Sequence, residues 1–327
     1  MRKVLITTVP FADKDRYPLD LLEKNNIEYV INPLNRKLKE EELAEMVLDF
    51  DVIIAGTENI SEKVMNNARK LKHISRVGIG LDSVDLITAR NKGIQVSYTP
   101  DAPAPAVSEL TIGIMLSLLR STNIANTRMH NKKWERFFGR RISEITIGII
   151  GTGRIGLNVI RQLQSFNPKQ ILVNDINSSI RYQENLNIKH VNKQFLYQNA
   201  DVISLHVPLT PDTKNMITDS ELRSMKEDAI IINTSRGGII NESDLSTVLK
   251  QGHLSAAAID VFQDEPYYGD LTEIENCFLT SHMGSMSIDC RTRMEIEATE
   301  EAVRFITGKP LEGLVPNEEF EAQSQGL

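Results

Sequence analysis

Three residues in the last third of the chain, Arg236, Glu265 and His282, have side chains suited to acid–base chemistry on a carboxylic acid. Histidine suits proton transfer because its imidazole titrates near neutral pH. A carboxylate such as Glu265 would fix the imidazole tautomer and favour its protonated form. A guanidinium such as Arg236 binds a carboxylate in fork geometry and polarises a neighbouring carbonyl. The reduction of a 2-keto acid, which needs a proton on the carbonyl oxygen and hydride on the carbon, would use side chains of these types.

Each of these residues follows a short apolar run, in the segments NTSRGG, AAAIDVFQDEP and LTSHMGS. The C-terminal ends of parallel strands share one edge of a sheet, where ligands bind in open α/β folds. Taken singly, a histidine before a glycine is more often a loop residue, and Glu265–Pro266 could be a simple turn. The joint arrangement favours a catalytic role for all three.

The segment TIGIIGTGRIG places Gly151, Gly153 and Gly156 in the G-x-G-x-x-G spacing. It follows a predicted strand, 147–150, and opens a predicted helix, 154–166. In that context the first glycine permits a tight turn, the second lets the backbone approach a pyrophosphate, and the third allows close helix–strand packing. The helix N-terminus offers free N–H groups to the phosphates. The motif therefore predicts a dinucleotide site.

Asp175 ends the next predicted strand, about 20 residues beyond the glycines, where dinucleotide-binding folds carry an acidic residue. A carboxylate there accepts hydrogen bonds from the ribose hydroxyls and repels a 2′-phosphate. Ile176 and Asn177 follow it, so no arginine stands ready for that phosphate. The sequence thus favours NAD over NADP, although a surface aspartate after a strand would be the reading without the glycines.

Short apolar runs alternate with amphipathic segments along the whole chain, which indicates α/β architecture with parallel sheets. The first series of predicted strands is 4–9, 28–31, 52–55, 74–77 and 94–97. The second series of six is 147–150, 171–174, 202–205, 230–233, 257–261 and 278–280. Between the series, Pro100, Pro103 and Pro105 predict a break and hinge, and a largely apolar helix is expected over 107–120.

The expected fold is two doubly wound parallel-sheet domains, a Rossmann NAD-binding domain inserted into a flavodoxin-like domain. Residues 1–99 form the first part of the flavodoxin-like domain and residues 100–286 the Rossmann domain. Residues 287–327 return to the first domain through a helix at 288–306, and the polar tail after Pro310 is expected to pack loosely.

Composition excludes several other classes of protein. The chain of 327 residues has 41% hydrophobic residues and a formal charge of −7, which gives no reason to expect a nucleic-acid or membrane partner. Its apolar segment 110–119 is too short to cross a bilayer. Cys277 and Cys290 cannot build a disulfide framework or a thiolate metal site, so we expect no metal and a cytoplasmic location.

With these motifs in order, the chain resembles the D-isomer specific 2-hydroxyacid dehydrogenase family, nearest its phosphoglycerate dehydrogenase branch. The resemblance rests on RVGIGLDSVD, GTGRIG, HVPLTPDT, NTSRGG, IDVFQDEP and SHMGS, and covers Lys3 to about Pro316. It implies an NAD-dependent enzyme that interconverts a D-2-hydroxy acid and its 2-keto acid.

The resemblance also assigns residues to roles. It makes Arg236, Glu265 and His282 catalytic. Positions implied to bind the cofactor are Gly151, Gly153, Arg154, Ile155, Gly156, Asp175, His206, Val207, Pro208, Thr213, Thr234, Ser235, Arg236, Asp260, His282 and Gly284, with Asp260 at the nicotinamide carboxamide. Positions implied to bind substrate are Arg76, Gly78, Ile79, Gly80, Arg236 and His282, the glycine loop through its backbone N–H groups.

The chain departs from the family pattern at a position that bears on the substrate. Phosphoglycerate enzymes commonly carry an arginine after the third strand, where this chain has Ala55. We therefore expect 3-phosphohydroxypyruvate to be accepted, but with a smaller advantage over unphosphorylated keto acids than a dedicated enzyme has. The residues after Pro310 are too few for the regulatory domain of longer relatives, so serine feedback through such a domain is not expected.

Two other functions share this fold. One is a non-enzymatic NAD-sensing regulator, and turnover of any 2-keto acid with NADH would separate it from the enzyme. The other is a formate-type dehydrogenase, which uses glutamine where Glu265 stands. We also expect a homodimer built around residues 107–141, because the helix is apolar and the arm KKWERFFGRR is unlikely to fold alone. The resemblance implies that this arm crosses to a neighbouring subunit.

Overall fold

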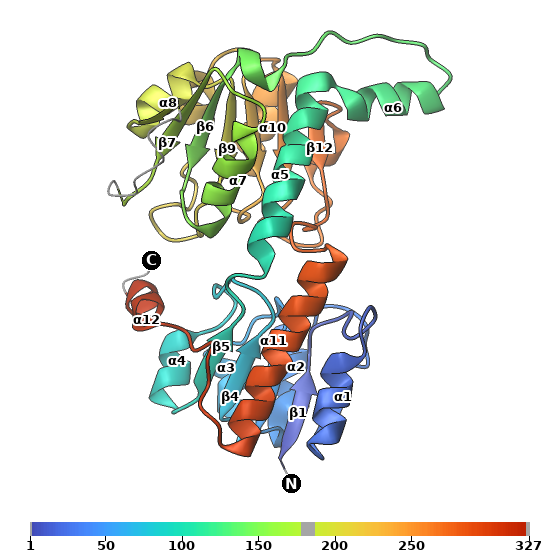
Figure 1. The fold of residues 1–327 in the computed structure, drawn as a ribbon, viewed down its shortest axis with the longest axis vertical. Helices are drawn as coiled ribbons and strands as arrows, with labels where there is room; N and C mark the ends of the chain where they lie inside the picture. Colours follow the sequence, from blue (N-terminus) through green and yellow to red (C-terminus); the bar gives the residue numbers. More distant parts are fainter. Residues whose placement is uncertain (1, 178–186, 325–327) are drawn as a thin grey trace. The chain divides into compact units, whose positions relative to one another are not determined.

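The computed structural model describes residues 2–177 and 187–324, which form two compact α/β units (Figure 1). One unit combines Met1–Pro103 with Met286–Leu327, and the other is Ala104–Ser285. The second unit is thus inserted into the first along the chain. Every strand ladder in both sheets is parallel, which confirms two doubly wound parallel-sheet domains, one Rossmann and one flavodoxin-like.

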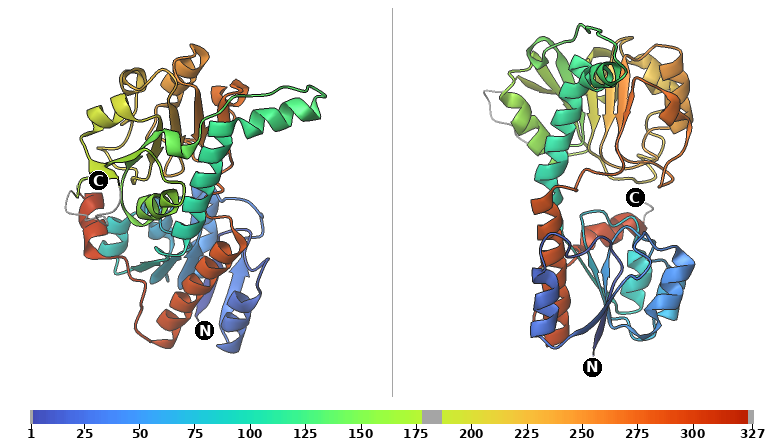
Figure 2. Two further views of the ribbon diagram at one scale, coloured as in Figure 1. Left: turned by 45° about the horizontal axis from the view of Figure 1, so that its top comes forward. Right: turned by 90° about the vertical axis from the view of Figure 1, so that its right-hand side faces the viewer.

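The discontinuous unit has a five-stranded sheet in the order β2-β1-β3-β4-β5. Its strands are β1 (Lys3–Ile6), β2 (Glu28–Ile31), β3 (Val52–Ala55), β4 (His73–Arg76) and β5 (Gln95–Tyr98). One face is covered by α1 (Tyr17–Lys24) and α11 (Ile288–Thr307), the other by α2 (Glu40–Met46), α3 (Glu62–Asn67) and α4 (Leu86–Asn91) (Figure 2). The central strand β3 is an unbroken apolar run because both faces of the sheet are covered.

The inserted unit has a seven-stranded sheet in the order β12-β11-β10-β9-β6-β7-β8. Its strands are β6 (Thr146–Ile150), β7 (Gln170–Asn174), β8 (Ile188–His190), β9 (Val202–Leu205), β10 (Ile230–Asn233), β11 (Ala256–Ile259) and β12 (Cys277–Leu279). Helices α5 (Pro103–Arg120) and α7 (Arg154–Gln164) cover one face, and α8 (Lys193–Asn199), α9 (Asp219–Ser224) and α10 (Glu242–Lys250) the other. Strand order reverses between β6 and β9, the point where such sheets bind ligands.

Two sequence predictions in this unit were wrong. The sheet has seven strands and not six, because the edge strand β8 is three residues long and has no apolar run to mark it. The helix expected over 107–120 starts earlier, since Pro103 and Pro105 lie in the first turn of α5, while the chain passes between the two units at this cluster, after Pro103. Proline is tolerated there because the first-turn N–H groups have no intrahelical partner.

The tail after Pro310 does not pack loosely as predicted. Val315 is buried and its N–H donates to Val96 O (3.0 Å). Helix α12 (Asn317–Ser324) packs against α4, where the Gln323 side chain accepts from Leu86 N (2.7 Å) and donates to Val84 O (2.9 Å). A polar composition hid this packing because the contacts are made by hydrogen bonds and a few apolar residues.

Short 3₁₀ turns at Val47–Asp49, Ile142–Glu144 and Asp270–Glu273 complete the described elements, together with α6 (Thr122–His130). Helix α6 has no buried residue and extends away from the sheet of its own unit (Figure 1). Residues 131–140 return from it without regular structure.

Candidate active site

His282 and Glu265 face each other at the carboxyl edge of the inserted unit's sheet. The His282 Nδ1 atom lies 3.0 Å from Glu265 Oε1 and 2.9 Å from Oε2. Their side chains keep 36% and 25% of their surface exposed, so the pair is reachable from solvent. Because the carboxylate holds Nδ1, the other ring nitrogen, Nε2, is the one available for proton transfer.

The loop that carries His282 is organised by Asp260. His282 has φ = 53°, in the left-handed region that non-glycine residues seldom adopt. Its N–H donates to Asp260 O (2.8 Å). The buried Asp260 carboxylate accepts from Thr280 Oγ1 (2.5 Å), Met283 N (2.7 Å) and Gly284 N (2.9 Å). These bonds offset the cost of the unusual backbone and commit the Asp260 oxygens to the loop.

Arg236 lies in a tight turn after β10. Asn233 closes the turn: its Nδ2 donates to Arg236 O (2.8 Å), and its Oδ1 accepts from Ser235 N (3.0 Å) and Oγ (2.7 Å). Thr234 Oγ1 bonds Thr111 Oγ1 of α5 (2.8 Å). The hydroxyls of Thr234 and Ser235 therefore have internal partners, and the half-buried Arg236 guanidinium donates to Ser235 O (2.7 Å).

The glycine-rich turn has the geometry that a dinucleotide needs. Gly151 has φ = 90°, and a Cβ there would lie 2.4 Å from His206 O. A Cβ on Gly156 would lie 2.0 Å from Gly151 O, so helix and strand are in backbone contact. At Gly153 a Cβ would meet nothing within 4 Å, which leaves space for a ligand. Gly153 is the N-cap of α7, and the N–H groups of its first turn lack intrahelical partners.

Two of those first-turn N–H groups belong to Arg154 and Ile155, predicted to contact the cofactor. Asp175 stands beside the same turn: its Oδ2 accepts from Thr152 Oγ1 (2.9 Å) and its Oδ1 from Asn177 N (2.8 Å). Burial opposes ionisation of Asp175, but the hydrogen bonds from Thr152 and Asn177 outweigh it and lower its pKa. The charged Asp175 carboxylate fits the ribose hydroxyls of NAD, and the N-terminus of α7 fits its pyrophosphate.

The predicted cofactor residues after β9 have mainly internal contacts. Burial lowers the pKa of His206 to about 4, and its Nε2 bonds Ser204 Oγ (2.9 Å), so the ring is neutral at physiological pH. Val207 and Pro208 follow it along the edge. The Thr213 hydroxyl donates to Pro208 O (2.6 Å) and accepts from Thr210 N (2.7 Å), which closes the loop.

The predicted substrate loop belongs to the discontinuous unit. Gly78 has φ = 134°, and its N–H donates to Thr99 Oγ1 (2.8 Å). Of the three predicted N–H groups, those of Ile79 and Gly80 donate to no other residue that the structure describes. Arg76 is buried at the end of β4, where its guanidinium donates to Val77 O. The structure therefore keeps Arg76 inside its own unit.

Sequence reasoning missed two carboxylates at these edges. Glu58 is only 2% exposed and accepts from Thr7 Oγ1 and from Gly56 N (2.8 Å). Glu242, the first residue of α10, accepts from Gln263 N (2.8 Å). A glutamate shortly after a predicted strand was the available signal for Glu58. Glu242 lies in the first turn of a helix, where acidic residues are generally favoured. The sequence therefore carried no signal of its contact with Gln263 N.

Within residues 2–177 and 187–324, no group of three or more histidine, cysteine, aspartate or glutamate side chains could hold a metal ion. No helix in the described part of the chain has the length and apolar character needed to cross a membrane.

Comparison with known proteins gives a consistent result. The family model "D-isomer specific 2-hydroxyacid dehydrogenase, NAD binding domain" matches residues 112–284. The D-3-phosphoglycerate dehydrogenase of Methanocaldococcus jannaschii is 36% identical over 284 residues, 85% of this chain and 54% of that protein. The hydroxypyruvate reductase of Thermotoga maritima is 33% identical over 295 residues, 88% of this chain and 94% of that protein.

Among solved structures, the TT0316 protein of Thermus thermophilus superimposes with a TM-score of 0.85 and 29% identity, covering 97% of this chain and all of that one. The chain thus spans about half the length of the phosphoglycerate dehydrogenase and most of the length of the reductase. The sequence motifs, the fold and these matches agree, and the chain belongs to the D-isomer specific 2-hydroxyacid dehydrogenase family, a family of NAD-dependent oxidoreductases.

Proposed function

We propose that this chain interconverts a small D-2-hydroxy acid and its 2-keto acid, with Arg236, Glu265 and His282 as the catalytic residues. The observation that carries the proposal is the contact between His282 Nδ1 and the Glu265 carboxylate (2.9 Å) on a loop fixed by Asp260. The Gly151–Gly156 turn and Asp175 would hold NAD, which would supply or accept the hydride at carbon 2 of the substrate.

The protein's own groups handle charge and protons. In the direction of reduction, protonated His282 gives its Nε2 proton to the carbonyl oxygen, and Glu265 stabilises the imidazolium before that transfer. Arg236 binds the substrate carboxylate and polarises the adjacent carbonyl. The Ile79 and Gly80 N–H groups of the discontinuous unit are also proposed to bind substrate. Oxidation of the hydroxy acid runs through the same groups in reverse.

The substrate we propose does not depend on a phosphate. 3-Phosphohydroxypyruvate is turned over with only a small advantage over unphosphorylated keto acids, because a phosphate carries nearly two negative charges and needs fixed cations. Ala55 at the end of β3 is buried and supplies no charge. The buried carboxylate of Glu58 lies just beyond it along the chain. The match to a hydroxypyruvate reductase over 94% of that protein supports the same substrate class.

A panel of four 2-keto acids tests the proposal: phosphohydroxypyruvate, glyoxylate, hydroxypyruvate and pyruvate, each assayed by NADH oxidation. We expect turnover of at least one unphosphorylated acid. The absence of NADH oxidation with all four would contradict the assigned reaction. A preference for phosphohydroxypyruvate above ~10³-fold, about 4 kcal/mol, would contradict the substrate class alone.

We further propose a homodimer that uses the excursion 121–141. Helix α6 has no buried residue, and the arm leaves Trp134 77% exposed and Phe138 fully exposed. Both ends of the excursion are tied to the inserted unit, by Arg128–Glu275 (2.6 Å) and by Arg140 to Asp228 O (2.9 Å). An anchored segment that presents large aromatic rings fits a second copy of the chain. Light scattering at micromolar concentration should give the mass of a dimer, and a monomer would count against it.

We place the protein in the cytoplasm. Cys277 and Cys290 are both buried free thiols, and disulfides are rare in that compartment. Fractionation of cells that express the chain, followed by detection in the cytosolic and membrane fractions, checks this.

A further inference from the structure

The turn that carries Glu265 packs against the segment that follows Arg236. A Cβ on Gly237 would lie 1.9 Å from the carbonyl carbon of Phe262 and 2.4 Å from Gln263 N. The two backbones are therefore in direct contact, and only glycine fits at this position. A displacement of either segment would be transmitted to the other, which links the Arg236 turn to the Glu265 turn.

Glu242 adds a directed bond to this contact. Its Oε1 accepts from Gln263 N (2.8 Å), two residues before Glu265. The position of Glu242 is itself fixed, because Asn241 caps α10 by accepting from Asp244 N (3.0 Å). On the other side of the turn, the Phe262 and Tyr267 rings stack with centroids 4.3 Å apart. The turn is thus held at both ends, with the Gln263 N–H bonded to a side chain.

A carboxylate is an unfavourable choice for this task on electrostatic grounds. Burial raises the pKa of Glu242, the Gln263 N–H opposes that rise, and the charges of Asp264 and Glu265 add to it. Burial also raises the pKa of Tyr267, and the charge of Glu242 adds to that rise. An amide would accept the same hydrogen bond without repulsion from Glu265. The hydrogen bond to Gln263 N, and not the negative charge, is therefore what Glu242 contributes to the turn.

We propose that Glu242 is a positioning residue of this active site, which holds the Phe262–Pro266 turn through Gln263 N so that Glu265 stays against His282. The inference rests on the proposed function, because it assigns Glu242 a role in the proton transfer described there. Through Glu265, Glu242 keeps the imidazole oriented. No contact of Glu242 with substrate or cofactor is involved.

Replacement of Glu242 by alanine and by glutamine separates the hydrogen bond from other effects. Glu242→Ala removes the acceptor, so we expect kcat for keto-acid reduction to fall roughly 10-fold with KM changed less than about twofold. The pH at which kcat/KM falls to half its maximum should move to lower pH, because a loosened Glu265 supports the imidazolium less well. Glu242→Gln keeps the acceptor and should retain kcat within about threefold.

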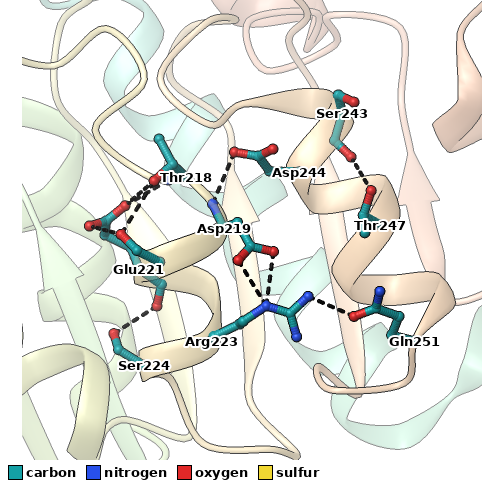
Figure 3. Close-up of polar contacts among 10 residues, drawn as sticks. Thr218, Asp219, Glu221, Arg223, Ser224, Ser243, Asp244, Thr247 and Gln251 are labelled. Carbon is teal, nitrogen blue, oxygen red and sulfur yellow. Dashed lines mark hydrogen bonds and ion pairs between the residues drawn. The ribbon is translucent and has the colours of Figure 1, made fainter.

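Asp244→Ala is the matched control. Asp244 lies in the same helical turn, and its carboxylate also accepts one backbone N–H, from Asp219 (3.0 Å) (Figure 3). Its partner belongs to α9 and not to the Glu265 turn. We expect this variant to keep kcat within about twofold and to leave the pH profile in place, even if its thermal stability falls as much as that of Glu242→Ala.

The outcomes separate the inference from the function it builds on. If wild type and Asp244→Ala do not oxidise NADH with any keto acid, the proposed function fails. If wild type is active and Glu242→Ala matches Asp244→Ala, or if Glu242→Gln loses as much kcat as Glu242→Ala, the positioning role is overturned. Should Glu242→Ala not fold, Glu242→Asp decides: its shorter side chain should lower kcat several-fold while Glu242→Gln does not, and the opposite order overturns the inference.

Discussion

The carboxyl edges of the two sheets both carry charged residues, but these residues differ in their exposure to solvent. On the inserted unit, His282 and Glu265 bond each other and keep 36% and 25% of their side-chain surface exposed. On the discontinuous unit, Glu58 and Arg76 are almost fully buried and have partners within that unit. The charged groups on the first edge are accessible to a substrate. Those on the second edge are buried and bonded within their own unit.

This difference distinguishes exposed residues that can take part in a reaction from buried residues that stabilise the fold. A buried charge is tolerated only when its hydrogen bonds are made within the protein, and such a group is then poorly placed to bind anything else. Asp260 combines the two situations. It lies at the same edge as His282 and Glu265, yet its carboxylate is buried and accepts hydrogen bonds from the His282 loop. The reactive pair can remain exposed because a buried group fixes its backbone.

The largest expected effect tests the reactive edge. If His282 transfers the proton, His282→Ala should lower kcat by roughly 10²–10⁴-fold while NADH affinity changes little. Steady-state kinetics and fluorescence titration with NADH measure the two. A variant with more than a tenth of the wild-type kcat would remove His282 from the mechanism, provided that a solvent-isotope or pre-steady-state experiment shows that product release does not limit the wild type.

A second expected effect concerns cofactor choice at the same edge. Asp175 accepts hydrogen bonds while charged and should repel a 2′-phosphate. Asp175→Ala should therefore narrow the ratio of kcat/KM with NADH to that with NADPH by roughly 10–100-fold, the value of a charge-assisted hydrogen bond. Asp212→Ala, which removes the same charge at an exposed position, is the control and should leave this ratio unchanged. Asp201 is less suitable for this purpose because it forms an ion pair with Lys226. An unchanged ratio in Asp175→Ala means that another residue selects the cofactor.

A third effect tests the cost of burial in the discontinuous unit. His73 is fully buried, its Nε2 bonds Ser97 Oγ (2.9 Å), and burial lowers its pKa to about 3. The unfolded chain takes up a proton near pH 6.5 and the folded chain does not, so stability is highest above that pH and falls as the pH drops toward 3. At pH 5 the loss from His73 is about 2 kcal/mol.

Urea unfolding at pH 7 and pH 5 measures this loss. His73→Gln keeps a partner for Ser97 but cannot titrate, so its free energy of unfolding should depend less on pH by about 2 kcal/mol. His130→Gln, at an exposed position, should behave as wild type. Equal pH dependence in all three proteins would show that His73 gains a proton without opening the fold.

The smallest expected effect sharpens the contrast at the substrate side. Glu58→Gln removes a buried negative charge beyond β3 and can still accept from Gly56 N. The ratio of kcat/KM for phosphohydroxypyruvate to that for hydroxypyruvate should rise about threefold to tenfold, because repulsion of the phosphate is relieved. Glu62→Gln makes the same charge change at an exposed position of α3 and should leave the ratio unaltered. A ratio that falls in Glu58→Gln contradicts the expected repulsion between Glu58 and the phosphate.

The sequence predicted the apolar strands well, because strands buried on both faces must be apolar runs. Predicted strands 52–55 and 202–205 agree with β3 and β9 residue for residue. Elements without that signal were missed: β8 is short and polar, and the tail helix α12 is held by Gln323. The start of α5 was placed late because prolines usually break a helix, and only the surrounding structure shows that these lie in its first turn.

At the site, residue types and their order along the chain determined the reaction class, since few combinations other than Arg236, Glu265 and His282 at successive strand ends suit keto-acid reduction. Only the tertiary structure decided what supports them. Asp260 bonds the His282 loop, Gly237 touches the backbone of Phe262, and Glu242 reaches Gln263, all across gaps of some twenty residues. The physical reason is that a parallel sheet brings consecutive strand ends to one edge, while the direction of each side chain there depends on turns whose hydrogen bonds exist only after the chain has folded.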